Sequence, residues 1–145
     1  MKKLLKIGLS LLVTGLVTAA LVWKFYINKP HDDIEKATPA YTMAAEELWK
    51  QYTGNLRIAD STYTGKVIEL TGTLNRAEKS DSLVYAVFVM EIDSMFVNKS
   101  VRCEMLPKYN ARTTATANGT PIKIKGFCTG FDGTDIKFNK CSIIN

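Results

Sequence analysis

The feature that most restricts the fold is an alternation of apolar and polar residues with period two, which recurs after residue 65. It is present in residues 67–74, 101–105, 122–129 and 136–144, whereas residues 83–92 are apolar at almost every position. Alternation predicts a strand with one buried face, and a continuous apolar run predicts a strand covered on both faces. We therefore expect five β-strands in this part of the chain.

The connections between these segments indicate how the strands are joined. Gly72 marks a bend in the first strand, Asp132-Gly133 is a hairpin signal, and a phase slip before Cys141 predicts a bulge near Asn139. Residues 107–121 form a link without a strand pattern. Together these features predict a mainly β domain, with residues 63–145 forming a five-stranded, OB-fold-like closed barrel. An open five-stranded sandwich is the alternative.

A helical pattern precedes the strands. In residues 42–52 the apolar spacing changes to that of a helix, with Thr42 as the expected N-cap. Four residues of this segment lie on one stripe of the expected helix, namely Ala45, Leu48, Trp49 and Tyr52. We expect Trp49 to dock the helix on the barrel, and a second short helical turn at residues 56–59 is a weaker prediction. Residues 40–62 are therefore expected to pack on the barrel.

The first 27 residues predict a membrane-spanning helix. Residues 7–23 contain no charged side chain, and a helix of that length is about 25 Å long, near the minimum for a bilayer. Both a cleaved signal peptide and an uncleaved signal anchor fit this pattern. We expect the anchor, because cleavage after the small residues 18–20 would leave an apolar new terminus, and because the aromatic residues at 23–26 are typical of a membrane interface. No cysteine lies in or just after the segment, so a lipid-modified N-terminal cysteine is excluded.

The distribution of charge predicts where the rest of the chain lies. The net charge of +5 is concentrated in residues 1–29, which contain five lysines and no acidic residue. Residues 30–145 contain equal numbers of basic and acidic side chains. The excess of lysines before the apolar segment favours a cytoplasmic N-terminus. We expect a single-pass protein of the inner membrane with an extracytoplasmic C-terminal domain, and residues 28–39 as a polar tether that contains an ordinary exposed His31.

Several strings resemble the tRNA-anti-like OB-fold family, a group of bacterial, often exported or membrane-attached proteins of unsettled function. The resemblance covers roughly residues 40–145, and its most specific strings are GKVIELTG at residues 65–72 and KGFCTGF at residues 125–131. Departures are Ala44, where a helix-capping serine is usual, and the threonine- and alanine-rich link before residue 121. The resemblance implies the fold, and a fold does not imply a function.

The three cysteines fit a structural role. The chain has no C-x-x-C pair and only His31 as an imidazole, so neither a zinc site nor a catalytic thiol is expected. An exported domain permits disulfides. In a barrel of this kind Cys141 can reach Cys128 or Cys103; we expect a Cys128–Cys141 bond, with Cys103 as a free thiol, and three unpaired thiols are the alternative. Closing that loop stabilises the fold by about 3 kcal/mol in the chain-entropy model.

The chain contains no pattern that predicts an enzyme, a cofactor or a metal site, because it lacks a phosphate-binding loop and a Ser/His/Asp set. We therefore expect a membrane-anchored binding or scaffolding module, whose partner is an envelope protein or a small ligand. Barrels of this class bind on the second and third strands and nearby loops. This predicts a site at residues 75–82 and 129–135, with the candidates Arg76, Lys79, Tyr85, Arg102 and Phe131.

Single-stranded nucleic-acid binding is the alternative function. Its support is a group of lysines expected on the last hairpin, namely Lys123, Lys125, Lys137 and Lys140. The neutral charge of residues 30–145, the acids Glu104, Asp132 and Asp135, and the expected compartment argue against it. A nucleic-acid partner is therefore not expected.

Overall fold

The computed structural model describes residues 13–22, 33–92, 94–95 and 97–144, and the chain divides into two units, Met1–Asp33 and Ile34–Asn145. In the first unit residues 13–22 are helical. The other residues of the predicted span, His31 and the first part of the predicted tether lie outside the described residues. Within the described part of the chain, no helix combines the length and the apolar character needed to cross a membrane.

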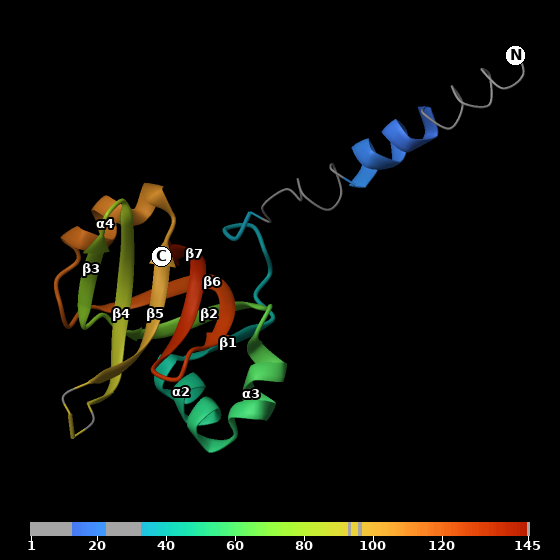
Figure 1. Ribbon diagram of the computed structural model, residues 1–145. Helices are drawn as coiled ribbons and strands as arrows, with labels where there is room; N and C mark the ends of the chain where they lie inside the picture. Colours follow the sequence, from blue (N-terminus) through green and yellow to red (C-terminus); the bar gives the residue numbers. More distant parts are fainter. Residues whose placement is uncertain (1–12, 23–32, 93, 96, 145) are drawn as a thin grey trace, which may run out of the picture. The chain divides into compact units, whose positions relative to one another are not determined.

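The second unit is built on one sheet of seven strands (Figure 1). The strands are β1 (Tyr41–Ala44), β2 (Val67–Thr73), β3 (Arg76–Ser80), β4 (Leu83–Ile92), β5 (Asn98–Met105), β6 (Pro121–Phe131) and β7 (Asp135–Ile144). Their order is β1-β2-β6-β7-β5-β4-β3, in which β1–β2 and β5–β7 are parallel and the other pairs antiparallel. The mainly β prediction is confirmed. The prediction of a closed five-stranded barrel is corrected, because the structure gives one open sheet with β1 and β3 at its edges.

Strand β1 replaces the first turn of the helix expected at residues 42–52. Tyr41 pairs with Ile68 and Ala44 pairs with Thr71, so this segment is extended along β2. Thr42 therefore lies in a strand and is not an N-cap. The helix α2 (Ala45–Gly54) starts three residues later, with Ala44 at the N-cap position and no side-chain cap.

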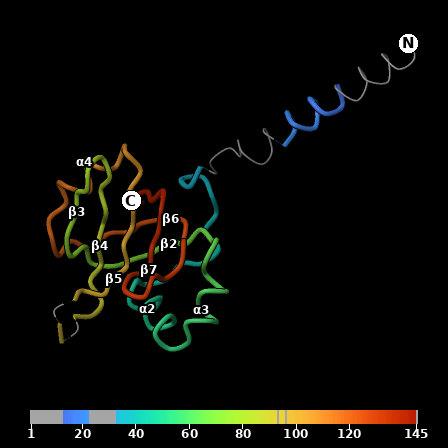
Figure 2. The backbone as a smooth tube through the Cα atoms, in the orientation of Figure 1, coloured from blue at the N-terminus to red at the C-terminus, as the bar shows by residue number. Residues whose placement is uncertain are grey.

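Strand β3 arises because the chain changes partner after β2. Thr73 is the last residue of β2 to pair with β6, and Arg76 is the first residue of β3 to pair with β4. Between them, the Leu74 amide donates to the Thr120 carbonyl (2.9 Å) and the Asn75 amide donates to the Val87 carbonyl (3.0 Å). The path from β2 into β3 can be followed in Figure 2. The bend predicted at Gly72 lies instead at Leu74–Asn75, since Gly72 pairs regularly with Ile122.

The helices cover two ends of the sheet. Helices α2 and α3 (Leu56–Tyr63) lie together near β1, β2 and β6, whereas the 3-10 turn η2 (Pro107–Tyr109) and α4 (Asn110–Ala115) follow β5 and lie near β3 and β4 (Figure 1). The predicted apolar stripe of α2 is buried, as expected. Helix α3 is longer than the predicted turn, and the Asn55 side chain caps it by accepting from the Ile58 amide (3.2 Å).

The core lies between the sheet and α2. Its largest fully buried side chains include Phe88, Leu48, Ile68, Leu70, Leu74, Ile124 and Ile136. Gly72 is needed for close packing rather than for a bend, because a Cβ atom there would lie 3.0 Å from the Phe88 ring. Burial of this apolar set is the main source of stability.

The end of the predicted tether is docked on the sheet. Ile34 is buried, and Glu35 accepts hydrogen bonds from Lys108 and Tyr109. The Lys125 amine is largely buried and donates to the carbonyls of Glu35 (2.8 Å) and Ala37 (2.9 Å). Residues 34–37 therefore belong to the folded domain, and the prediction of a free tether up to residue 39 is corrected for them. Where this segment covers the outer face of β6, the carbonyls of Glu35 and Ala37 supply the acceptors that the buried Lys125 amine requires.

The bulge predicted near Asn139 is confirmed. Cys103 pairs with Phe138 and Met105 with Cys141, so three residues of β7 span the distance of two residues of β5. Lys140 takes a left-handed conformation at this point (φ 52°). The bulge turns the Cys141 side chain toward Gly126, where an added Cβ atom would lie 2.4 Å from the Cys141 Sγ atom. A larger residue fits at position 126 only if the Cys141 thiol shifts.

Gly126→Ala is expected to lower the free energy of unfolding by about 1–3 kcal/mol, because the new methyl group overlaps the Cys141 sulfur. Chemical denaturation measures the effect. Adding Cys141→Ala should recover part of the loss, since it removes the overlapping atom, and a double-mutant cycle gives the coupling. Gly54→Ala is the matched control, because a Cβ atom at Gly54 meets no atom within 4 Å. Purely additive losses would contradict the contact.

Candidate functional site

A polar groove lies on the face formed by β4, β5 and the β6–β7 hairpin. Its volume is about 470 Å³, and its lining residues are Ser80, Tyr85, Arg102, Glu104, Thr129, Asp132, Asp135, Lys137, Phe138 and Asn139. We call it the β4–β5 groove. Its size is within the range of small-ligand sites. It contains Tyr85 and Arg102 of the predicted set, and three residues of the predicted 129–135 segment line it as well.

Arg102 is the centre of the β4–β5 groove. Its guanidinium carbon lies 5.0 Å from the centroid of the Tyr85 ring, which is a cation–π geometry. Its Nη2 atom donates to Glu78 Oε2 (2.7 Å), while the Arg76 Nε atom donates to the other oxygen of Glu78 (2.6 Å). The carboxylate of Glu78 thus bridges two arginines. These contacts hold the guanidinium over the Tyr85 ring.

Asp135 neutralises Arg102 from the opposite side. Its Oδ2 atom lies 3.8 Å from the Arg102 Nη1 atom. Its Oδ1 atom accepts from the amide (3.0 Å) and the hydroxyl (2.6 Å) of Ser100, its partner across the β5–β7 pair. A largely buried carboxylate is stable here because each oxygen has a partner. Asp135 therefore acts as a fixed acceptor at the floor of the groove.

The β6–β7 turn supplies the remaining charges. Asp132 accepts from the amides of Thr134 (2.9 Å) and Asp135 (2.8 Å), and Gly133 has a φ of 101°, as the predicted hairpin turn requires. The Lys137 amine lies 2.6 Å from Asp132 Oδ2. The Asp135 amide and the Lys137 amine lower the pKa of Asp132 to about 2. Asp132 is therefore ionised at any physiological pH and remains paired with Lys137.

The cations in the β4–β5 groove are matched by carboxylates, with one carboxylate in excess. Two cations, Arg102 and Lys137, face three carboxylates, those of Glu104, Asp132 and Asp135. Both cations already have carboxylate partners. A polyanion entering this groove would have to break these pairs and approach Glu104. The groove therefore suits a ligand with polar groups and no net negative charge.

The structure brings together only part of the predicted site. Arg76, Tyr85 and Arg102 belong to one network through Glu78. Lys79 is exposed on β3, and strand alternation places it on the face opposite Glu78. Phe131 lies with the helices, where its ring packs against Trp49 (centroids 6.0 Å apart) and Tyr52 (6.1 Å). Phe131 thus anchors α2 and does not line the β4–β5 groove.

Glu78 was not predicted as a site residue. Residues 75–82 were expected to be a loop, and in a loop the spacing Arg76-x-Glu78 has no structural meaning. In β3 that spacing places both side chains on one face. The basic cluster expected on the last hairpin is also corrected, because Lys123 pairs with Glu69 (3.4 Å) and Lys137 with Asp132, while Lys125 is covered by residues 34–37.

The three cysteines are buried free thiols in this structure. The expected Cys128–Cys141 bond is not formed, because β6–β7 pairing sets Cys128 opposite Phe138 and the bulge turns Cys141 toward Gly126. The Cys128 thiol instead lies 3.6 Å from the Tyr52 hydroxyl, and the Cys141 thiol contacts Cys103. Burial raises the pKa of Cys128 and of Cys141, so neither is poised as a nucleophile.

A family model described as tRNA_anti-like matches residues 1–143. The chain belongs to the tRNA-anti-like OB-fold family. This confirms the resemblance seen in the GKVIELTG and KGFCTGF strings. Among curated proteins, no sequence matches the chain significantly.

One of the similar solved structures supports this fold. A chain from Klebsiella pneumoniae, described as a "putative nucleic acid-binding lipoprotein", has a TM-score of 0.54 and 20% identity, over 81% of this chain and 100% of that chain. Two others are a "putative aspartyl-tRNA synthetase" from Leishmania major (TM-score 0.47, 9% identity, 76% of this chain and 22% of that chain) and an aspartyl tRNA synthetase from Entamoeba histolytica (0.45, 9%, 81% and 24%). This tRNA-anti-like chain thus spans less than a quarter of either synthetase.

The stabilisation from Asp132 is expected to depend on pH. The folded-state pKa of about 2 is below the value of about 3.9 for an unfolded aspartate. The stabilisation is therefore fully present above about pH 5 and disappears as the pH falls toward 2. Thermal melts of the wild type and of Asp132→Asn should differ at pH 6 and converge near pH 2.

Asp81→Asn is the control for this experiment, because it removes one negative charge from the β3–β4 turn and so reports the effect of net charge alone. A difference between wild type and Asp132→Asn that stays constant from pH 6 to pH 2 would contradict the assignment.

Proposed function

We propose that the protein is a non-enzymatic OB-fold binding module, and that the β4–β5 groove is its ligand site. The observation that carries the proposal is the fixed arrangement of Tyr85, Arg102 and Asp135 on neighbouring strands in a groove of about 470 Å³. Site residues on the second and third strands of an OB-fold, beside the last hairpin, match the surface that this fold uses for binding. Here these strands are β4 and β5.

The proposed ligand is polar and carries no net negative charge. Charged side chains that are already paired can still accept or donate further hydrogen bonds. Beside an aromatic ring, they can therefore bind hydroxyl and amide groups of a ligand while the ion pairs stay intact. The groove also offers the side chains of Ser80, Thr129 and Asn139. Asn139 Oδ1 is a buried acceptor that has no hydrogen-bond partner within the described residues.

Single-stranded nucleic-acid binding is the second candidate. Its support is the Arg102–Tyr85 stack, on which a base could pack, and the description of the Klebsiella pneumoniae chain as nucleic acid-binding. Against it is the lack of unpaired cations in the β4–β5 groove. Because phosphate contacts supply most of the affinity for nucleic acids, this candidate ranks second.

The two candidates predict opposite results with two probes. A fluorescent dT15 oligonucleotide, titrated at low salt, should show no saturable binding below roughly 100 μM, because its phosphates meet paired cations. A neutral oligosaccharide, used as the uncharged polar probe, should receive saturation transfer from the protein in NMR. Tyr85→Ala should abolish that transfer, and Lys79→Ala, on the opposite face, should not. Salt-sensitive dT15 binding that Tyr85→Ala weakens would reverse the ranking.

We further propose that residues 1–27 anchor the module in the inner membrane, with its C-terminal domain outside the cytoplasm. The support is the uncharged run at residues 7–23 and the excess of lysines before it. The Klebsiella pneumoniae chain is described as a lipoprotein, which suggests an envelope location by analogy. This chain has no cysteine before residue 103, so the helix itself would be the anchor.

The location is testable with two fusions to the C-terminus of the full chain. Alkaline phosphatase, which is active only outside the cytoplasm, should give active fusions, and β-galactosidase should give inactive ones. A fusion that lacks residues 1–27 is the control and should reverse both signals. High β-galactosidase activity of the full-length fusion would contradict the proposed orientation.

The same proposal treats β2 and β3 as two halves of one bent strand. Counted in this way, the pairs β2–β6, β6–β7, β7–β5, β5–β4 and β4–β3 follow the strand pairing of an OB-fold barrel. The hydrogen bonds of Leu74 and Asn75 to opposite neighbours support this interpretation.

A further inference from the structure

One carboxylate of the β4–β5 groove, that of Glu104, takes no part in the charge network. The cations around it are paired with other carboxylates, in the ion pairs Arg76–Glu78, Arg102–Glu78, Arg102–Asp135 and Lys137–Asp132. Among the residues that the structure describes, the Glu104 side chain has neither an ion pair nor a hydrogen bond. Lys140, the other lysine of β7, does not line the groove. The excess carboxylate of the groove is therefore that of Glu104.

Glu104 lies in the groove beside an aromatic ring. It is half-buried and is one of the lining residues. In the β4–β5 pair it lies directly opposite Tyr85, and side chains in that relation have Cβ atoms about 5 Å apart. An ammonium group that contacts the Glu104 carboxylate would therefore also lie beside the Tyr85 ring. A carboxylate and an aromatic ring are groups that stabilise a bound ammonium ion.

An unpaired carboxylate in this position is unfavourable for the fold. A half-buried carboxylate loses part of its hydration, and no cation compensates for Glu104. The carboxylates of Asp132 and Asp135, in the same groove, add electrostatic repulsion. Unfavourable features of this kind are expected at functional sites. A ligand with one positive charge would supply the cation that the groove lacks.

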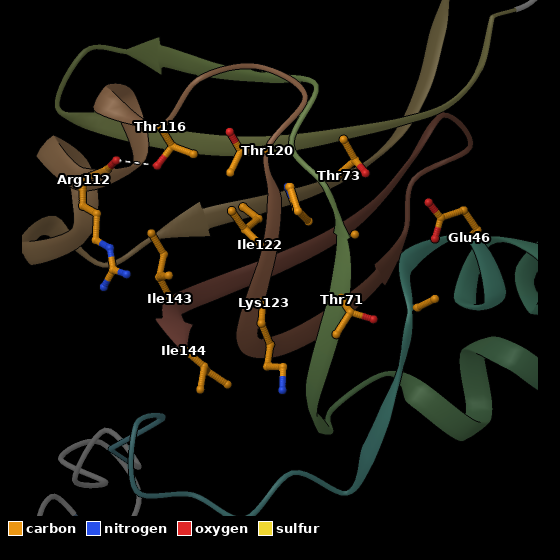
Figure 3. A pocket seen from close by; sticks show the side chains of 13 residues that line it. Glu46, Thr71, Thr73, Arg112, Thr116, Thr120, Ile122, Lys123, Ile143 and Ile144 are labelled. Carbon is orange, nitrogen blue, oxygen red and sulfur yellow. Dashed lines mark hydrogen bonds between the residues drawn. The ribbon is translucent and has the colours of Figure 1, made fainter.

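A second cavity, with a volume of about 670 Å³, provides a contrast. Figure 3 shows two of its charged lining residues, Glu46 and Arg112, on opposite sides of the view. Lys123 is paired with Glu69 (3.4 Å), and Arg112 also has an interaction partner. Glu46 is exposed and lies in the first turn of α2, where a carboxylate stabilises a helix. Each of these charges thus has a structural explanation, which Glu104 lacks.

We propose that the β4–β5 groove binds an amino sugar, a ring with hydroxyl groups and one protonated amine, and that Glu104 binds the amine. This rests on the function proposed for the groove and narrows the ligand from a polar molecule to a cationic one. The ring hydroxyls would contact the side chains of Ser80 and Thr129, which also line the groove. The groove volume of about 470 Å³ is sufficient for a small saccharide.

Four probes, used at pH 6, separate the charge from the sugar ring. Methyl glucosaminide, methyl glucoside and methyl N-acetylglucosaminide share one ring and carry an ammonium, a hydroxyl or an amide at the same carbon. Butylammonium carries the charge without the ring. The full chain, in a polyoxyethylene detergent that contains neither sugar nor charge, is titrated with each probe, and saturation transfer is measured by NMR. The glucosaminide should bind at least about tenfold more tightly than any other probe.

Variants assign this preference to Glu104. Glu104→Gln keeps the size of the side chain and removes its charge, so the affinity for the glucosaminide should fall to that for the glucoside. Glu46→Gln, which removes one carboxylate from the second cavity, is the matched control and should keep the preference of about tenfold. Glu104→Gln should also melt at or above the wild-type temperature, whereas the loss of a structural contact would lower it.

The results distinguish the amine site from the function on which it rests. Equal affinity for the glucosaminide and the glucoside, with both lost in Tyr85→Ala, would overturn the amine site and leave the β4–β5 groove as a ligand site. Equally tight binding of butylammonium would also overturn it, because the groove would then recognise a charge and not an amino sugar. Failure of all four probes to bind would contradict both proposals.

Discussion

The structure depends on the change of hydrogen-bond partner at Leu74 and Asn75. Up to Thr73 the strand pairs with β6, and from Arg76 it pairs with β4. Leu74 is fully buried, and the Asn75 side chain accepts from the Val89 amide (2.7 Å), so both residues are held at the crossing. Without this change of partner, β3 would have no fixed register against β4, and the hydrogen-bond network of Arg76 and Glu78 would not form.

The crossing also determines where the β4–β5 groove lies. After it, β3 presents Glu78 to Arg102 in the groove. Before it, the end of β2 pairs with the start of β6, whereas the groove is lined by Thr129, near the end of β6. The crossing thus separates the residues of β2, which pair with β6, from Glu78, which completes the charge network of the groove.

Much of the fold could be predicted because burial imposes a clear period on the sequence. The alternation of apolar and polar residues around Ile68, Ile124 and Ile136 predicted the strands that contain them. The stripe of apolar residues in α2 predicted the buried face of that helix. Short elements at sheet edges were missed, since β1 has only four residues and β3 contains a single apolar residue, Ala77, and both are stabilised by pairing with another strand. Thr42 shows the effect, because its local preference for an N-cap was overridden by pairing with Glu69.

The site was predicted less completely, because charges acquire their roles from neighbours that are distant in sequence. Tyr85 and Arg102 were found from the fold class alone. Their partner Glu78 lies 24 positions from Arg102 along the chain, and no local pattern links the two. Similarly, the lysines of the last hairpin were expected to act together, but each of Lys123, Lys125 and Lys137 has a different partner. The composition gives the number of charged side chains, but it does not show which of them form pairs in the fold.

The most direct test of the crossing is the exchange rate of individual backbone amides, measured by NMR on the full chain in deuterated buffer. The account predicts that the amides of Leu74 and Asn75 exchange as slowly as those in the middle of β4, because both are bonded within the sheet. Exchange at the rate of exposed turn amides such as Ser82, while β2 and β4 stay protected, would show that the two strands are not joined in this way.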